Sequence, residues 1–87
     1  MASFQVEWKK SALKELEKLP RQIVTRVVAA VDDLSANQYP HGVRKLVGAE
    51  HAYRIRVGDY GVIYHIFENK LVVKIVRVRH RKDAYTR

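Results

Sequence analysis

The chain has 87 residues, a formal net charge of +8 and no cysteine. That length supports one domain with one hydrophobic core over residues 1–87, and the lack of cysteine excludes disulfides and thiolate chemistry. No apolar run approaches the roughly 20 residues that cross a bilayer, and the start MASFQVEWKK lacks the apolar segment of a signal peptide. We therefore expect a cytoplasmic domain that has no membrane partner.

The N-terminal part of the chain predicts a strand followed by two helices. Apolar and polar residues alternate over 3–8, which is typical of a strand. Ser11 is the expected N-cap of a first helix, and Pro20 ends that helix and opens a second one over about 20–36. The second helix carries one apolar stripe, which consists of Ile23, Val27, Ala30, Val31 and Leu34.

The remainder of the chain predicts strands. Turn residues over 37–42 (NQYPHG) separate them from the helices. The expected strands are a short one within 43–49 and longer ones over 52–58, 60–67 and 71–79. This order predicts an α+β fold in which a helical hairpin packs on one face of a small, mostly antiparallel sheet.

The last predicted strand has two possible face patterns. Val73 and Ile75 have the same parity as Arg77 and Arg79, so an unbroken strand would direct core residues and cations to one face. A bulge near Ile75 would give a different arrangement, because one extra residue reverses the alternation. The sequence leaves both arrangements open.

The positive charge is concentrated in the second half of the chain. Residues 1–43 hold six cations against five anions (+1), and residues 44–87 hold eleven against four (+7). A basic half on a small domain is typical of a nucleic-acid-binding protein. A charge that serves solubility, or an acidic protein partner, would give the same composition.

Spacing argues against several kinds of catalytic site. The four histidines form no i, i+4 pair on a helix, so we expect no zinc or other metal site. Asp32 and Asp33 are adjacent on a helix and point about 100° apart, which suits a solvated face rather than a metal site or a catalytic carboxylate pair. The glycines form no phosphate-binding loop.

A set of cations on and around the strands remains. Arg54 and Arg56 alternate with apolar residues and therefore share one strand face. The other members are Lys45, Arg77, Arg79, Arg81 and Lys82, and Tyr85 follows them. Arginine forks fit phosphate oxygens, and a tyrosine can stack on a base. RNA carries its own 2′-OH nucleophile, so such a face can bind RNA or, with a group that moves protons, cleave it.

Several motifs make the chain resemble a known family. They are K-L-x-G (Lys45, Leu46, Gly48), Y-R-I-R-V-G-D-Y (53–60) and V-x-H-R-x-x-x-Y (Val78, His80, Arg81, Tyr85). An N-terminal S-A-x-K-E-L-x-K-L-P element (11–20) agrees with them. Nearly the whole chain thereby resembles the RelE/ParE superfamily of bacterial toxins, and the RelE branch most closely.

This resemblance implies a type II toxin that enters the ribosomal A site and cleaves mRNA there. The 2′-OH would attack the adjacent phosphate, without a metal or other cofactor. The implied partners are the ribosome, mRNA and a RelB-like antitoxin that wraps the toxin in a hetero-oligomer.

The resemblance also implies roles for individual residues. The implied catalytic residues are Arg54, Arg56, Arg81 and Tyr85. The arginines would stabilise the phosphate and the transition state, and the tyrosine would stack on or orient the nucleotide. The expected RNA-binding cations beside them are Lys45, Arg79 and Lys82.

One residue departs from the family pattern. Where the family commonly reads G-D-Y-R-V-I-Y, residues 58–64 read GDYGVIY, so Gly61 stands in place of an active-site arginine. Losing one charge-assisted hydrogen bond costs about 1.5–3 kcal/mol, or roughly a tenfold to hundredfold loss in rate. The alternatives are an active toxin with compensating cations, a detoxifying substitution, a ParE-like binder of DNA gyrase, and a weakened member that only binds antitoxin or RNA.

Overall fold

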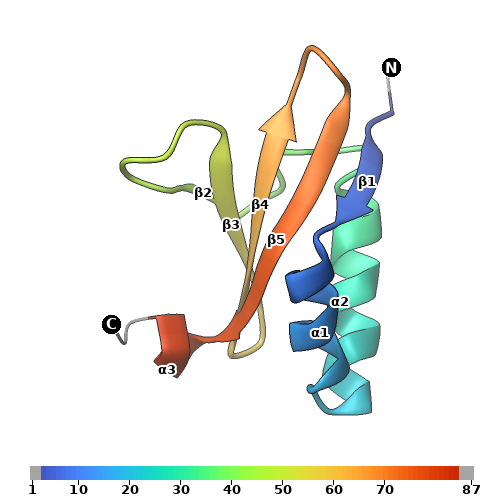
Figure 1. Ribbon diagram of the computed structural model, residues 1–87, viewed down its shortest axis with the longest axis vertical. Helices are drawn as coiled ribbons and strands as arrows, with labels where there is room; N and C mark the ends of the chain where they lie inside the picture. The colour runs from blue at the N-terminus through green and yellow to red at the C-terminus, as the bar shows by residue number, and fades with distance from the viewer. Residues whose placement is uncertain (1–2, 85–87) are drawn as a thin grey trace.

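The computed structural model describes residues 3–84 of the chain. In chain order its elements are β1 (Gln5–Trp8), α1 (Lys10–Glu17), α2 (Arg21–Asp33), β2 (Arg44–Lys45), β3 (Ala52–Val57), β4 (Tyr60–Phe67), β5 (Val72–His80) and α3 (Arg81–Ala84). Figure 1 shows α1 and α2 together on one side of the strands, and the short α3 on the other side.

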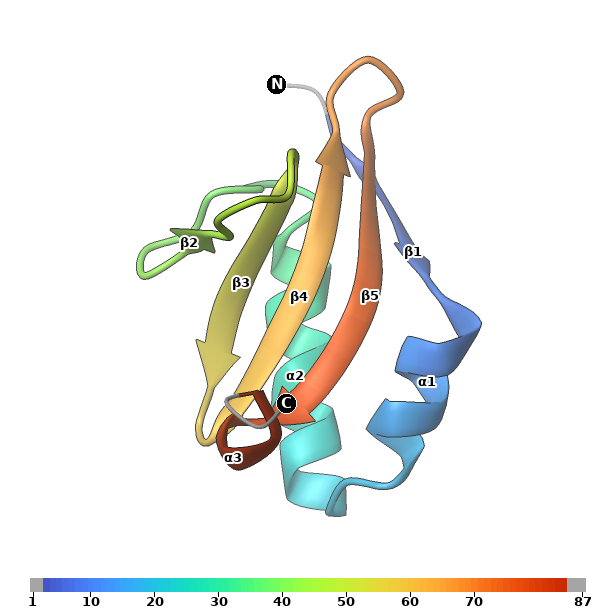
Figure 2. The same ribbon diagram turned by 60° about the vertical axis from the view of Figure 1, so that its left-hand side comes forward.

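The five strands form one sheet in the order β1-β5-β4-β3-β2. β1 runs parallel to β5, and every other neighbouring pair is antiparallel. Figure 2 shows α2 behind the sheet and α1 beside the β5 edge. The predicted α+β fold, with a helical hairpin on one face of a mostly antiparallel sheet, is confirmed.

The core lies between α2 and the covered face of the sheet. Val27, Val31 and Leu34, at helical spacing, are completely buried. The sheet residues in the same cluster include Val62, Ile66, Val73 and Ile75. Tyr64 is also fully buried, and its hydroxyl donates a hydrogen bond to the Gln38 carbonyl at 2.9 Å. Each such side chain contributes about 1.5–3 kcal/mol through burial, so this interface fixes the sheet on the helices.

The first helix begins earlier than predicted. α1 starts at Lys10 with Lys9 as its N-cap, so the prediction of Ser11 as N-cap is wrong. Pairing between β1 and β5 explains the difference. The Lys9 N–H still bonds to the Ile75 carbonyl at 2.9 Å, and the Lys9 carbonyl already accepts the N–H of Leu13 at 3.0 Å. The chain therefore changes from strand to helix at Lys9, and no side chain caps the N-terminus of the helix.

The second helix follows Pro20, as predicted, but it ends sooner. Pro20 occupies the N-cap position, where its missing N–H costs nothing. α2 ends at Asp33, because residues 34–36 tighten into turns in which each N–H bonds to the carbonyl three residues earlier. Among the residues that the structure describes, no helix is long and apolar enough to cross a membrane.

A β-bulge in β5 decides which way its cations face. Tyr64 pairs with Ile75 and Ile63 pairs with Arg77, so Val76 is an extra residue with no partner on β4. The bulge reverses the alternation and places Arg77 on the face opposite Ile75. Of the two arrangements that the sequence allowed, the bulged one is therefore present. Helices α1 and α2 cover one face of the sheet, and the strand arginines lie on the other, which we call the open face.

Candidate functional site

Two rows of paired residues cross the open face. In the first row, Arg56 pairs with Gly61, and Gly61 pairs with Arg79. In the second row, Arg44 pairs with Arg54, and the row continues through Ile63 to Arg77. Residues paired directly across strands project to the same face, and so do residues two apart along a strand. Five arginines on three strands therefore share this face. Neighbouring strands lie about 5 Å apart, so Arg44 is one spacing from Arg54, whereas the arginines of β3 and β5 are two spacings, about 10 Å, apart.

The pair formed by Arg44 and Arg54 is unusual for a sheet. Like charges directly opposite each other destabilise a strand pair. These two arginines nevertheless line, with Arg56 and Gly42, a groove of about 570 Å³, and none of the lining residues that the structure describes is acidic. An arrangement that opposes folding and gathers positive charge in a groove is typical of an anion-binding site.

Gly61 lies beneath the side chain of Arg54. A Cβ built on Gly61 would stand 3.3 Å from Arg54 Cδ and 3.7 Å from its Cγ. Gly61 is buried although it belongs to the open face, because the aliphatic stem of Arg54 covers it. The backbone at Gly61 is not in the left-handed region, so no conformational need for glycine exists at this position.

Helix α3 is anchored where β5 ends. The N–H of Arg81 donates to the Asp59 carbonyl at 2.7 Å, in the turn between β3 and β4. The N–H of Lys82 donates to His80 Nδ1 at 3.1 Å, and the His80 ring meets the Tyr60 ring edge-on with centroids 5.1 Å apart. Figures 1 and 2 agree that α3 lies on the open side of the sheet.

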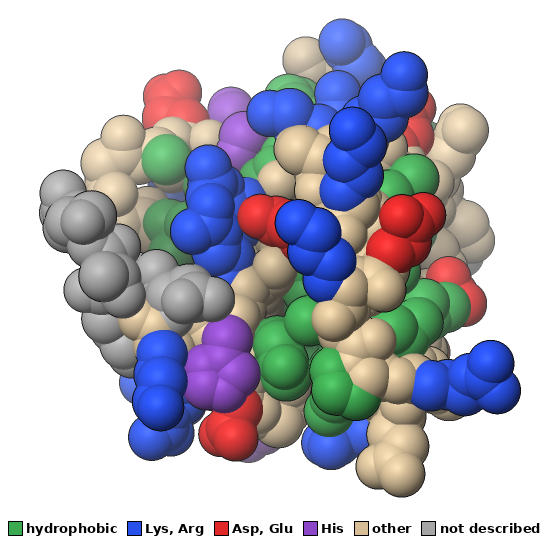
Figure 3. All heavy atoms as spheres, turned by 60° about the horizontal axis from the view of Figure 1, so that its bottom comes forward, with side chains coloured by type: hydrophobic (Ala, Val, Ile, Leu, Met, Phe, Trp, Pro, Cys, Tyr) green, Lys and Arg blue, Asp and Glu red, His purple; other side chains and the backbone are tan. Residues whose placement is uncertain are grey.

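The anchoring of α3 places two further cations at the end of the open face. Arg81 and Lys82 are both exposed. Figure 3 shows this end of the molecule, where Lys and Arg side chains are spread around an exposed hydrophobic area with a few acidic groups among them. Tyr85, the remaining predicted catalytic residue, lies outside the described residues.

The predicted site residues do not all lie on the same face of the sheet. Arg54 and Arg56 share the open face with Arg79. Lys45 lies on the covered face instead, because it pairs with Tyr53, and its Nζ is 6.0 Å from the centre of that ring. Arg44 takes the position on the open face beside Arg54. Sequence reasoning left Arg44 out of the site, because nothing in a two-residue strand shows which residue faces which way.

A second cavity, at the other end of the sheet, has a different character. It has a volume of about 450 Å³ and is lined mainly by aromatic and polar residues, among them Tyr39, Tyr53, Phe67 and Glu68. The Tyr39 hydroxyl donates to Glu68 Oε2 at 2.6 Å, and this bond raises the pKa of Tyr39 well above its usual range. A tyrosine so strongly held is a poor proton donor near neutral pH. Within residues 3–84, no three His, Cys, Asp or Glu side chains gather as a metal site.

Comparison with known proteins identifies the family. The family described as ParE toxin of type II toxin–antitoxin system, parDE, matches residues 6–85. Toxin RelG of Mycobacterium tuberculosis is 36% identical over 97% of this chain and 98% of its own length. Putative toxin RelE1 of Methanocaldococcus jannaschii is 28% identical over 94% of both chains.

Solved structures agree with this assignment. The RelE–RelB complex of Pyrococcus horikoshii OT3 contains a chain that superposes with a TM-score of 0.82 at 32% identity, over 91% of this chain and 96% of the other. The toxin–antitoxin complex RelBE2 of M. tuberculosis gives a TM-score of 0.79 at 32% identity, over 93% and 94%. The chain therefore belongs to the RelE/ParE superfamily and is a RelE-family toxin of a type II toxin–antitoxin system.

Proposed function

We propose that this toxin is a ribosome-dependent endoribonuclease that cuts mRNA in the A site and thereby inhibits translation. The observation that carries the proposal is the Arg56–Gly61–Arg79 row beside the Arg44–Arg54 pair. Three of these arginines, Arg44, Arg54 and Arg56, line one groove, and none of its described lining residues is acidic. A phosphate group is the ligand whose charge and shape fit several arginine forks at once.

The proposed reaction needs charge stabilisation more than a protein nucleophile. The 2′-OH attacks the adjacent phosphorus, the bond to the 5′-oxygen breaks, and the products carry a 2′,3′-cyclic phosphate and a 5′-OH. Negative charge develops on the phosphate oxygens and on the leaving oxygen. Arg54 and Arg56 would stabilise the former, and Arg81, at the end of the open face, the leaving group. Removing one donor from such a site costs roughly 10²–10³ in rate.

The partners in this proposal follow from charge and from the relatives. The RelE chain of P. horikoshii was solved with RelB, and RelBE2 of M. tuberculosis is a toxin–antitoxin complex. We propose a RelB-like antitoxin for this chain as well. With a net charge of +8, the toxin favours anionic partners such as the mRNA and the ribosomal RNA of the cytoplasm.

Cleavage on programmed ribosomes tests the function. The natural chain should cut the mRNA within the codon that occupies the A site, and primer extension would map the cut. Arg56→Ala should lower the rate at least tenfold, because it removes a cation from the row. Arg21→Ala, at the exposed start of α2, is the matched control and should cut as the natural chain does. Intact mRNA with both the natural chain and Gly61→Arg would overturn the proposal.

A second function is favoured by two observations. The family that matches the chain is described as ParE toxin. Residue 61 is glycine, where the nuclease pattern has an arginine. A ParE-like toxin would bind DNA gyrase without catalysis. Inhibition of supercoiling by stoichiometric protein, with mRNA left intact on ribosomes, would support this function over the nuclease. A chain inactive in both assays would be one that only binds antitoxin or RNA.

A further inference from the structure

One side chain of α1 completes the free edge of β5. β1 pairs with β5 only from Val72 to Ile75, so N–H groups further along that edge lie beyond the end of β1. Glu15 Oε1 accepts the N–H of Val78 at 2.8 Å. The carboxylate thus occupies the position that the carbonyl of another strand would take.

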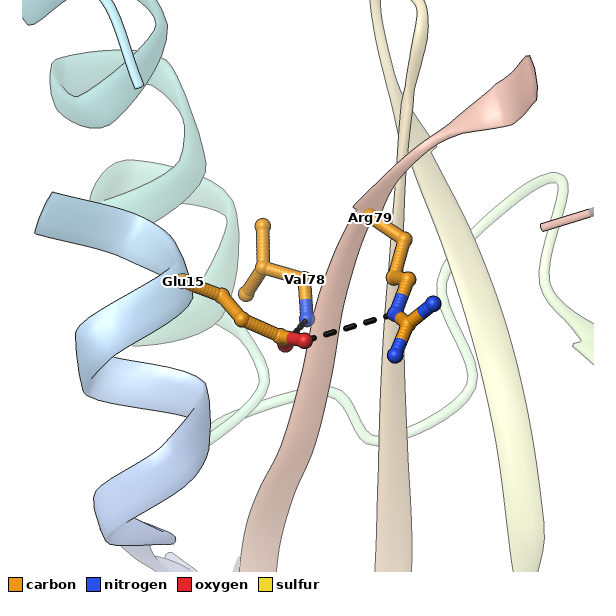
Figure 4. A network of polar contacts seen from close by, with 3 residues as sticks. All are labelled: Glu15, Val78 and Arg79. Atoms are coloured by element: carbon orange, nitrogen blue, oxygen red, sulfur yellow. Dashed lines mark hydrogen bonds and ion pairs between the residues drawn. The ribbon is translucent and has the colours of Figure 1, made fainter. Parts of the chain in front are cut away.

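The other oxygen of the same carboxylate meets Arg79. Glu15 Oε2 lies 3.3 Å from Arg79 Nε, as Figure 4 shows. This Nε atom is buried, and its contact with the carboxylate is an ion pair without hydrogen-bond geometry. The Arg79 side chain as a whole is nevertheless 37% exposed. The contact therefore holds the inner edge of the guanidinium and leaves its outer part, with the two Nη atoms, available to a ligand.

We propose that Glu15 is a positioning residue that directs Arg79 toward the phosphate of bound RNA. This inference rests on the function proposed above. Arg79 forms one end of the row that crosses Gly61, and Arg56 forms the other end. A long side chain at the rim of a sheet has many rotamers, and the ion pair selects one of them before RNA arrives. The two Nη atoms can then bind phosphate oxygens as a fork while Nε stays on Glu15.

Closing the strand edge does not by itself explain this arrangement. A neutral glutamine would also accept the Val78 N–H, although through a weaker hydrogen bond because it carries no charge. A carboxylate beside a phosphate-binding cation also reduces the positive potential of the site, so a site that used charge alone would bind RNA better without it. The two roles therefore make opposite predictions for Glu15→Gln. A simple edge contact predicts unchanged cleavage with tighter RNA binding, and a positioning role predicts slower cleavage.

A double-mutant cycle on the cleavage rate separates these roles. Glu15→Gln should lower kcat about three- to tenfold and leave KM unchanged or lower, because the charge lost is negative. Arg79→Ala should lower kcat further, and the double variant should equal Arg79→Ala alone, because Glu15 acts through Arg79. Glu17→Gln, on the exposed side of the same helix, is the control and should match the natural chain. An equal loss from Glu15→Gln with and without Arg79, or no loss, would overturn the proposal.

Arg79→Lys provides a second variant that leaves the contact between Glu15 and Val78 intact. Lysine keeps the charge but has no fork and no Nε. If Arg79 acts as a positioned fork, this variant should lose nearly as much kcat as Arg79→Ala. Full activity in Arg79→Lys would show that charge alone suffices and would overturn the positioning role. Thermal unfolding of each variant checks that the fold is retained.

A spectroscopic measurement tests the inference even if the chain cleaves no RNA. The Nε–H proton of Arg79 is buried, so it should exchange slowly with water in the natural chain and in Glu17→Gln. It should exchange faster in Glu15→Gln, because the charge that holds the guanidinium in this buried position is lost. On adding an RNA oligonucleotide with 2′-deoxy substitutions, the Nη protons should shift while the Nε–H proton stays protected. Loss of that protection on RNA binding would show that RNA displaces Glu15, which would overturn the inference. Failure of the nuclease function would appear separately, as intact mRNA on ribosomes.

Discussion

The aliphatic stem of Arg54 occupies the space above Gly61 into which a side chain at residue 61 would project. A Cβ at residue 61 would stand 3.3 Å from Arg54 Cδ, which is tight but involves the movable part of a long side chain. Arg54 thus reaches over β4 from β3 because β4 offers no side chain there. Gly61 therefore contributes no cation of its own to the open face, but it allows the side chain of Arg54 to lie across the centre of that face.

Gly61→Arg should fold and should gain activity. Arg54 can move by a few tenths of an ångström, and the backbone at residue 61 suits any residue, so the change in unfolding free energy should stay within about 0.5–1 kcal/mol. A restored charge-assisted contact to phosphate should raise the cleavage rate about tenfold or more. Thermal unfolding and cleavage on programmed ribosomes measure the two effects.

Gly61→Ala separates the steric effect from the charge. Its Cβ meets the Arg54 stem in the same way but brings no cation, so it should give no gain in cleavage and a similar melting temperature. If alanine raised the rate as much as arginine, the position of Arg54 rather than the missing charge would be what limits activity.

Arg44 should contribute more to RNA affinity than Lys45 does. Arg44 lies beside Arg54 in the groove of the open face, whereas Lys45 points to the covered face near Tyr53. Removing one phosphate contact to a single strand reduces the slope of log K against log salt by about 0.7. Fluorescence anisotropy with an RNA oligonucleotide should show that change for Arg44→Ala and a smaller one for Lys45→Ala. Equal slopes for the two variants would contradict the placement of the site on the open face.

Periodicity in the sequence was sufficient for most of the fold. The alternation in β3 assigned Arg54 and Arg56 to one face, and the helical stripe of α2 predicted its buried side. Both patterns repeat over several residues, so several positions independently indicate which side of the element is buried. Pro20 marked the junction between the helices because its fixed φ angle suits the residue before a first turn.

Features set by a single residue or by distant contacts could not be predicted in this way. The bulge at Val76 depends on how β5 meets β4, and local alternation fits both a bulged and an unbroken strand. β2 has only two residues, so it carries no pattern that separates Arg44 from Lys45. The contact between Glu15 and Arg79 joins elements at opposite ends of the chain and exists only in the folded molecule.

Tyr64→Phe should destabilise the protein at neutral pH. Its hydroxyl donates to the Gln38 carbonyl and thus ties β4 to the loop after α2. Losing this hydrogen bond should lower the free energy of unfolding by about 0.5–1.5 kcal/mol. Urea unfolding at pH 7 would measure the loss, with Tyr60→Phe as the control. A variant as stable as the natural chain would show that the carbonyl finds another donor.

The same substitution should change the stability in alkali. Burial, followed by the neighbouring Tyr53, raises the pKa of Tyr64 to about 12. An unfolded tyrosine loses its proton near pH 10, so Tyr64 favours the folded state fully below about pH 10, and this contribution is lost between about pH 10 and 12. Tyr64→Phe should therefore lose less stability over this window than the natural chain. Parallel curves for the two proteins would rule out Tyr64 as the titrating group.

His65 should make the protein less stable in mild acid. Burial lowers the pKa of His65, and the neighbouring His51, Lys74 and Lys9 lower it further. The unfolded chain takes up a proton at this residue from about pH 6.5 downward, whereas the folded chain stays neutral to a lower pH. Because the folded state binds fewer protons there, stability is full above about pH 6.5 and falls as the pH decreases. His65→Gln should therefore make the denaturation midpoint fall less steeply between about pH 7.5 and 5.5. A fall that is equally steep in His65→Gln would assign the acid sensitivity to another group.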